Sequence, residues 1–252
     1  MTDAPPTHQR LWQKKLARQA RLRFVGGLCA GLPNLAEQLT SKLAVMLAKP
    51  GAEMGRTHVA LSAAAVELGH SRQAWVEAAH KLLRQSMLAA DGGAEKPPPL
   101  TSFELVTDDA MEGKIFASRL SVQVLEAVAV SFDSVRRTTQ FLEDSELAAT
   151  DVLRPEAWCL KLVEAWEEAP MGRASLVVVR PELLALLVQL GTTCYVGVQQ
   201  FYEEQNAATE EDLRAHRIKR SESEGYAGAA GTGAAGVGVG AMGAMGAQAN
   251  AG

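Results

Sequence analysis

Apolar residues recur at three- and four-residue spacing along most of the chain, and this spacing constrains the fold more than any other feature. Every fourth residue from Leu35 to Leu47 is a leucine, which places these side chains on one face of a helix. The only strand-like run, 176–179, has four residues and is too short to make a sheet alone. The sequence therefore predicts an all-α fold, a multi-helix bundle.

Prolines, glycines and capping residues predict where the helices begin and end. Pro155 suits the first position of a helix, and Asp108 followed by Asp109 favours another helix start. The glycine after Leu68 and the prolines at 33 and 181 are read as breaks between helices. The predicted helices are 8–24, 33–48, 57–68, 71–91, 108–142, 155–170 and a last one that starts at Pro181.

The longest predicted helix, 108–142, carries an a/d-like apolar pattern that we expect to be its buried stripe. The residues of this stripe are Ile115, Val122, Leu125, Ala129 and Phe132.

A short Gly- and Pro-rich segment, GGAEKPPP at 92–99, interrupts the helical pattern. Three consecutive prolines favour an extended spacer, so we predict a boundary there. The predicted organisation is an N-terminal helical region 1–91, a linker 92–100, a helical domain 101–222 and a Gly/Ala-rich disordered tail 223–252.

Basic residues cluster near the N-terminus although the whole chain carries a net charge of −4. Residues 4–36 contain six basic residues and no acid, and a second basic run lies at 214–220. Helix 8–24 is therefore predicted to be basic and amphipathic, with Trp12, Leu16 and Phe24 on its apolar side. It could dock on an anionic lipid, nucleic acid or acidic protein, or it could lie on its own acidic body. The candidate docking residues are Arg10, Lys14, Lys15, Arg18, Arg21 and Arg23.

Three other patterns resemble chemical motifs but favour structural interpretations. Two GxGxxG matches, 231–236 and 238–243, lie in the Gly-rich tail without the strand and helix that a dinucleotide site needs. Glu77 and His80 form an ExxH, the half-motif of a di-iron site, but such a pair on a helix face is more often solvated than metal-binding. The acids Asp108, Asp109 and Glu112 are explained by a helix N-terminus. We therefore predict no catalytic residues, no cofactor and no metal.

The cysteines and the apolar stretches bear on the compartment. Cys29, Cys159 and Cys194 lie far apart without a CxxC pair, which favours buried thiols in a reducing compartment. The uncharged stretch 183–202 is nominally long enough to cross a bilayer, but Gln, Gly and Thr interrupt it, so we expect a buried helix of a soluble bundle. We expect a cytoplasmic protein.

Residues 105–112, with the sequence LVTDDAME, resemble the acidic helix start of a proteobacterial family of unknown function, DUF1631. Residues 153–159 (LRPEAWC) resemble that family's leucine–x–proline–glutamate–alanine helix start. Residues 183–206 and 213–220 resemble its closing helix and short basic exit. The resemblance covers about 100–222 and implies a helical, cytoplasmic protein with no established catalytic residues.

These observations favour a non-enzymatic helical protein that works through partners, as a protein–protein interaction or regulatory module. One alternative is a peripheral binder of anionic membrane or nucleic acid through helix 8–24. Another is an enzyme with an unrecognised site. We expect the main partner to be another protein and leave a homo-oligomer open, with no small-molecule substrate inferred.

Overall fold

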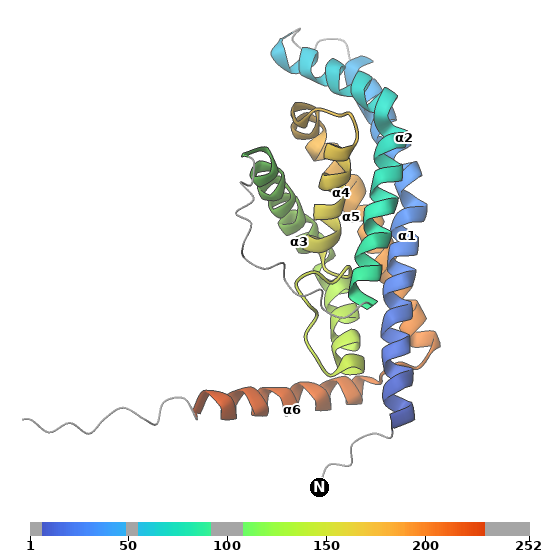
Figure 1. Cartoon of the computed structure of the whole chain (residues 1–252), viewed down its shortest axis with the longest axis vertical. Coiled ribbons are helices and arrows are strands. Elements are labelled where there is room, and N and C mark those ends of the chain that lie inside the picture. Colours follow the sequence, from blue (N-terminus) through green and yellow to red (C-terminus); the bar gives the residue numbers. More distant parts are fainter. Residues whose placement is uncertain (1–6, 49–54, 92–107, 230–252) are drawn as a thin grey trace, which may run out of the picture. The chain divides into compact units, whose positions relative to one another are not determined.

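The computed structural model describes residues 7–48, 55–91 and 108–229. These residues form helices joined by short turns, with no strand among them, so the all-α prediction is confirmed (Figure 1). The helices are α1 (Thr7–Ala48), α2 (Arg56–Asp91), α3 (Asp108–Glu143), α4 (Pro155–Glu168), α5 (Arg173–Glu204) and α6 (Glu210–Ala229).

Helix α1 is continuous where the sequence predicted two helices, 8–24 and 33–48. Pro33 lies inside α1 and has no N–H to donate to the carbonyl of Cys29, four residues earlier. His80 of α2 lies 2.7 Å from that carbonyl oxygen through its Nε2 and replaces the missing donor. The predicted break was wrong because a neighbouring helix supplies the hydrogen bond that proline removes.

Helix α2 likewise replaces the two predicted helices 57–68 and 71–91. Leu61, Leu68 and Trp75 lie seven residues apart and are all buried on one face. Gly69 lowers the intrinsic helix propensity of this segment, but α2 and its buried face continue past Gly69. Local propensity predicted a break that tertiary packing overrides.

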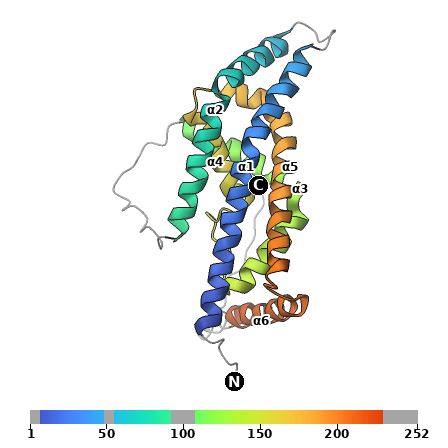
Figure 2. The same cartoon turned by 90° about the vertical axis from the view of Figure 1, so that its right-hand side faces the viewer.

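Helix α1 lies between α2 and α5 (Figure 2). It runs antiparallel to α5, because Lys42 pairs with Glu182 near one end while Arg23 lies over Phe201 near the other. The two backbones approach closely at Gly27, where an added Cβ would lie 3.0 Å from Cys194 Sγ. Gly27 and Gly31 therefore give α1 a smooth surface against α5.

Three tryptophans, Trp75, Trp158 and Trp166, are fully buried in the common core. Trp75 and Trp166 meet edge to face with ring centroids 5.3 Å apart. Their indole N–H groups donate to the carbonyls of Leu162 and Gly172. Each buried aromatic ring of this pair therefore keeps its polar atom satisfied.

Helices on both sides of the Gly/Pro segment share this core. Met1–Thr209 form one compact unit, in which α1 and α2 pack on α4 and α5. The grouping into separable regions 1–91 and 101–222 is therefore not the one that the structure shows. The apolar faces of α1 and α2 are buried against the later helices rather than in a core of their own. The predicted linker 92–100 lies outside the described residues.

Helix α5 begins at Arg173, eight residues before the predicted start. The strand-like run 176–179 is helical, and Leu176 and Val179 are buried three residues apart on one face. Pro181 lies inside the third turn of the helix instead of opening it. The predicted starts at Asp108 and Pro155 are confirmed, and Arg154 is the N-cap of α4.

Helix α6 belongs to a second unit, Glu210–Gly252, and is described by itself. Its first turn holds Glu210, Glu211 and Asp212, which favour a helix N-terminus. The basic run 214–220, which the resemblance placed in a short exit after the closing helix, lies inside α6. Helix α6 includes the first residues of the predicted tail, and the rest of the tail, 230–252 with both GxGxxG matches, lies outside the described residues.

Candidate functional site

The six basic residues predicted to dock outward divide into two groups in α1. Arg10, Lys14 and Lys15 are exposed on the first turns of the helix. Arg18 is also exposed and interacts within the chain. Arg23 is exposed and lies over the ring of Phe201. Arg21 is buried in ion pairs within the chain, so the docking prediction is corrected for Arg21.

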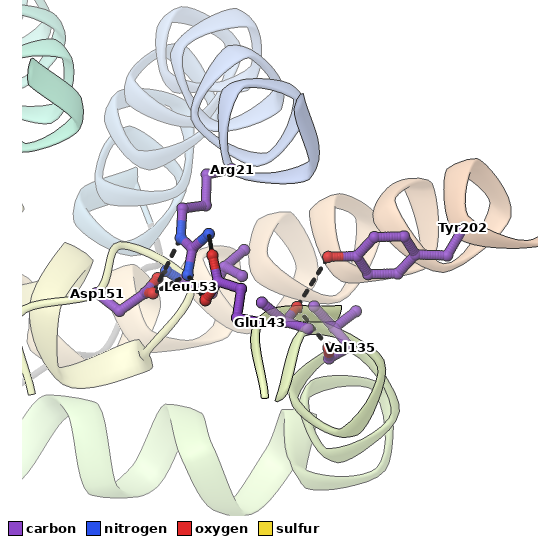
Figure 3. Close-up of polar contacts among 7 residues, drawn as sticks. Arg21, Val135, Glu143, Asp151, Leu153 and Tyr202 are labelled. Carbon is purple, nitrogen blue, oxygen red and sulfur yellow. Dashed lines mark hydrogen bonds and ion pairs between the residues drawn. The ribbon is translucent and has the colours of Figure 1, made fainter. Parts of the chain in front are cut away.

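Arg21 makes the most extensive ion-pair contacts of the described residues (Figure 3). Its two terminal nitrogens donate to the two carboxylate oxygens of Glu143 at 2.6 and 2.8 Å. Its Nε and one terminal nitrogen donate to Asp151 Oδ2 at 2.9 and 2.6 Å. The exposed fractions of the side chains are 11% for Arg21 and 6% for Asp151. The guanidinium therefore joins α1 to the end of α3 and to the loop before α4.

Burial by itself would lower the pKa of Arg21, but the hydrogen bonds and charges of Glu143 and Asp151 outweigh it and raise the pKa above its ordinary value. Arg21 therefore stays charged at any pH at which the protein is folded. Its burial follows from the helical pattern, because Ala17 and Leu28, four and seven residues away, are buried on the same side of α1. The charge of Arg21 alone did not indicate that its side chain lies on the buried side of α1.

The loop from Glu143 to Pro155 is held by further buried hydrogen bonds. Asp151 Oδ1 accepts the backbone N–H of Leu153 at 2.9 Å. The hydroxyl of Tyr195 in α5 donates to the Leu153 carbonyl at 2.6 Å. Thr139 lies 2.8 Å from the Tyr202 hydroxyl and also from the carbonyl of Val135 (Figure 3). These hydrogen bonds fix the loop to α3 and α5.

The apolar side predicted for the docking helix is divided in the same way as its charges. Leu16 and Phe24 are buried in the core, and Phe24 packs on Tyr195 with ring centroids 4.7 Å apart. Trp12 remains 41% exposed, and Leu11, which the prediction did not include, is 64% exposed. The first turns of α1 therefore present both apolar and basic side chains to solvent.

The ExxH pair of α2 has a structural role. His80 donates to the Cys29 carbonyl, and Glu77 accepts a hydrogen bond from Gln73 at 2.9 Å. Among residues 7–48, 55–91 and 108–229, no group of three or more His, Cys, Asp or Glu side chains could hold a metal ion.

A carboxylate from another helix caps the start of α5. Glu67 of α2 accepts the backbone N–H of Gly172 at 2.9 Å and the hydroxyl of Ser175 at 2.6 Å. Gly172 is the N-cap of α5 and has no side chain of its own to satisfy the first N–H groups. The Glu67 charge also lies at the positive end of the helix dipole, which stabilises the α2–α5 contact.

The acidic start of α3 is engaged by the start of α5 as well. Glu112 accepts a hydrogen bond from Arg173 at 3.0 Å, and Arg173 also pairs with Glu167 at 2.8 Å. The side chains of Asp108 and Asp109 lie outside the described residues. Glu112 therefore takes part in an ion pair between helices.

All three cysteines are buried thiols. Burial raises the pKa of Cys194 to about 12, and the neighbouring Cys29 adds to this effect. Burial likewise raises the pKa of Cys29 and of Cys159 above the ordinary range. A thiol that holds its proton at neutral pH is a poor nucleophile and a poor metal ligand.

Helix α3 presents an apolar stripe to solvent, on the face where the sequence predicted burial. Ile115 is 45% exposed and Val122 is 51% exposed, and Ala129 is exposed as well. The buried face of α3 instead carries another apolar series at three- and four-residue spacing. This series is Ala117, Leu120, Val124, Val128, Phe132 and Val135. The predicted stripe was wrong at Ile115, Val122 and Ala129, because α3 has two apolar faces and periodicity cannot tell which one meets the core. Leu125 is partly buried against the core and Phe132 is buried.

The exposed side of α3 extends beyond the predicted residues. Met111 is 52% exposed and Val130 is 86% exposed. We call Met111, Ile115, Val122, Ala129 and Val130 the α3 stripe. Isolated exposed apolar residues are common, but a row along one helix face is typical of a contact surface.

Within residues 7–48, 55–91 and 108–229, two helices are long and apolar enough, by length and composition alone, to cross a membrane. They are Met111–Glu143 and Arg173–Glu204. Core helices of soluble proteins can be equally long and apolar, so the cytoplasmic location stays a prediction.

Comparison with known proteins identifies one relationship. A family model described as the N-terminal domain of a protein of unknown function, DUF1631, matches residues 13–208. The match begins in α1, well before the segment 100–222 on which the sequence resemblance rested. Curated proteins and solved structures gave no match.

Proposed function

The chain belongs to the DUF1631 family, whose description assigns no activity, and we propose that it is a non-enzymatic protein-interaction module that binds its partner through the α3 stripe. The exposure of this stripe is the observation that supports the proposal. Met111, Ile115 and Val122 each expose about half of their surface although they lie on a helix whose other face is fully packed. Covering this row would remove apolar surface from water, which is the main driving force of protein association.

The polar groups of the interior also favour a scaffold over an enzyme. The charged groups of Arg21, Glu143 and Asp151 bond to one another. The Tyr202 hydroxyl is bonded to Thr139, and the carboxylate of Glu67 is bonded to the start of α5. Catalytic groups usually face a cleft in which substrate can reach them, whereas these groups fix helices to one another.

Photo-cross-linking tests the proposal. Val122→Cys and Val59→Cys each place one exposed thiol on a helix, since Val59 is 69% exposed on α2 and the three natural cysteines are buried. Each variant is labelled with a photoreactive maleimide and irradiated in extract of the native host. We expect defined adducts from position 122 that unlabelled wild type suppresses and Val122→Asp does not. Equal adducts from both positions, or none from position 122, would contradict the proposal.

A second candidate function rests on the first turns of α1. Leu11 and Trp12 are exposed beside Arg10, Lys14 and Lys15, a combination typical of helices that dock on an anionic surface. This function needs only these residues and does not use Arg21 or Arg23. It requires the chain to bind vesicles containing phosphatidylserine more tightly than neutral vesicles. The binding should weaken with salt and with the pair Lys14→Glu and Lys15→Glu, and salt-independent binding would exclude it.

A further inference from the structure

We infer that the partner of the α3 stripe is a second copy of this chain, whose α3 lies antiparallel to the first. This inference rests on the proposed interaction role of the stripe. Three observations support a second copy as the partner: the spacing of the stripe, the charges along its edge and the side chains that are already buried beside it.

The stripe has the spacing of a helix–helix seam. Four residues of the stripe, together with exposed Ser118 and partly buried Leu125 between them, alternate at four and three residues, which is the a/d pattern of a coiled coil. In order they are Met111, Ile115, Ser118, Val122, Leu125 and Ala129. At 1.5 Å per residue the row from 111 to 129 is about 27 Å long. A straight row of this length fits another helix better than it fits a compact pocket or an extended peptide.

One edge of the stripe carries charges at heptad spacing. Glu112, Arg119, Glu126 and Asp133 follow one another every seven residues, each next to a d position of the stripe. Arg119 and Glu126 are both exposed, and no ion pair within the described residues engages either of them. One helix cannot pair them with each other, because seven residues separate them by about 10 Å along the axis.

An antiparallel second copy pairs both charges. When the two α3 helices cross near Val122 and Gln123, Arg119 of each copy lies opposite Glu126 of the other copy. The contact is self-complementary and closes with two-fold symmetry, as most homodimer interfaces do. Two reciprocal ion pairs then flank a seam in which Val122 of one copy meets Leu125 of the other.

The outer charges of this edge agree with the same arrangement. Glu112 of one copy would lie near Asp133 of the other, which by itself is a like-charge contact. However, Glu112 is paired with Arg173 and Asp133 with Arg136 and Arg137 inside each chain. Each outer carboxylate is therefore already neutralised, and only Arg119 and Glu126 need a partner.

A parallel arrangement lacks these partners. In a parallel pair, the edge with Arg119 and Glu126 would face the opposite edge of the second copy. That edge carries Ser121, which is 1% exposed, and Val128, which is 2% exposed, and both are buried in their own bundle. Arg119 and Glu126 therefore find partners only in the antiparallel orientation. A single helix pair buries less surface than a standard stable interface, so we expect a weak dimer with a Kd in the range of about 1–100 μM.

Sedimentation velocity of the full chain across that concentration range tests the dimer. We expect wild type to dimerise as concentration rises, Val122→Asp to remain monomeric, and Val59→Asp to behave like wild type. Val59 is exposed on α2 and receives the same substitution, so it controls for the added charge. A dimer that Val122→Asp leaves intact, or a wild type that stays monomeric, would overturn the inference.

Charge exchange tests the orientation. Arg119→Glu gives a chain with two acids at these positions, and Glu126→Arg gives a chain with two bases, so each variant repels its own copy. We expect each variant alone to dimerise at least about tenfold more weakly than wild type. Their equimolar mixture should form a heterodimer at wild-type strength, and Arg119→Glu combined with Glu126→Arg in one chain should restore the homodimer. No recovery in either experiment would refute the antiparallel pairing.

These outcomes separate the dimer from the proposed interaction function. If wild type is monomeric while position 122 still forms an adduct with another protein, the second copy is wrong and the interaction function stands. If position 122 forms no adduct and vesicle binding depends on Val122, a membrane covers the stripe, and both proposals are wrong.

Discussion

His80 of α2 donates its Nε2 hydrogen to the backbone carbonyl of Cys29 in the middle of α1, across 2.7 Å. A carbonyl oxygen can only accept, so this contact fixes the tautomer of the imidazole with the proton on Nε2. Cys29 needs the donor because Pro33, which occupies the position that would normally donate, has no N–H. One side chain thus permits a proline inside a 42-residue helix and joins that helix to its neighbour.

His80→Ala should therefore destabilise the fold by about 1–2 kcal/mol, since it leaves a partly buried carbonyl without a donor. Urea unfolding followed by circular dichroism measures the loss. Gln73→Ala, which removes an exposed hydrogen bond of the same helix, is the control and should change stability by less than about 0.5 kcal/mol.

Pro33→Ala tests the cause of this loss. It restores an N–H to α1, so the cost of His80→Ala should fall when both substitutions are present. A coupling of about 1 kcal/mol is expected from such a double-mutant cycle. Strict additivity of the two substitutions would show that His80 stabilises the protein in another way.

Arg21→Met should be among the most destabilising single substitutions, with a loss of about 3–5 kcal/mol, because it leaves two carboxylates near the interior without a cation. Arg21→Lys keeps the charge but loses the bidentate geometry with Glu143, so it should cost less. Chemical denaturation of the two variants gives their order. Arg72→Met replaces an exposed arginine of α2 and serves as the control. An equally large loss of unfolding free energy in that variant would show that the ion pairs of Arg21 are not the cause of its effect.

Glu67→Gln should lower stability by about 1 kcal/mol, because the amide oxygen still accepts from Gly172 and Ser175 but the charge at the start of α5 is lost. Glu67→Ala removes both and should cost more. Thermal unfolding compares these variants with Glu77→Gln, which changes an exposed glutamate of the same helix that accepts a hydrogen bond from Gln73 within α2. Equal effects at positions 67 and 77 would mean that Glu67 does not cap α5.

The helical class was predictable because apolar spacing and the starts at Asp108 and Pro155 depend on short stretches of sequence. The continuity of α1 through Pro33 and of α2 through Gly69 was not predictable in this way. Pro33 is tolerated through His80, 47 positions later in the sequence, and Gly69 through the packing of Leu68 and Trp75. Sequence spacing shows which residues share a face but not which distant helix supplies a missing hydrogen bond.

The candidate site shows the same limit. Arg10, Lys14 and Lys15 are exposed as expected from charge alone, whereas Arg21 is buried because Glu143 and Asp151 come to it from later segments. Helix α3 has two apolar series, and only contacts with α4 and α5 decide which one is buried.

Alkaline pH should destabilise the protein through its buried thiols and phenols. Burial raises the pKa of Cys194 from 9.0 to about 12 and raises the pKa of Tyr195 and Tyr202 above 10.0. A group with a raised pKa in the folded state keeps its proton, while the unfolded chain releases it once the pH passes the ordinary value. Stability should therefore be constant with respect to these groups below about pH 8 and fall above about pH 9, by up to about 1.4 kcal/mol per pH unit for each group.

Urea unfolding at a series of pH values from neutral to alkaline measures this slope, and Cys194→Ala identifies the contribution of one group. The variant should lose some stability at neutral pH, because a buried side chain is shortened, but its stability should fall less steeply above about pH 9. The native thiols should also react slowly with an alkylating agent at pH 8 and rapidly in urea, because folding holds their protons and excludes the reagent. A Cys194→Ala slope equal to that of wild type, together with fast labelling of the native chain, would show that Cys194 is neither buried nor raised in pKa.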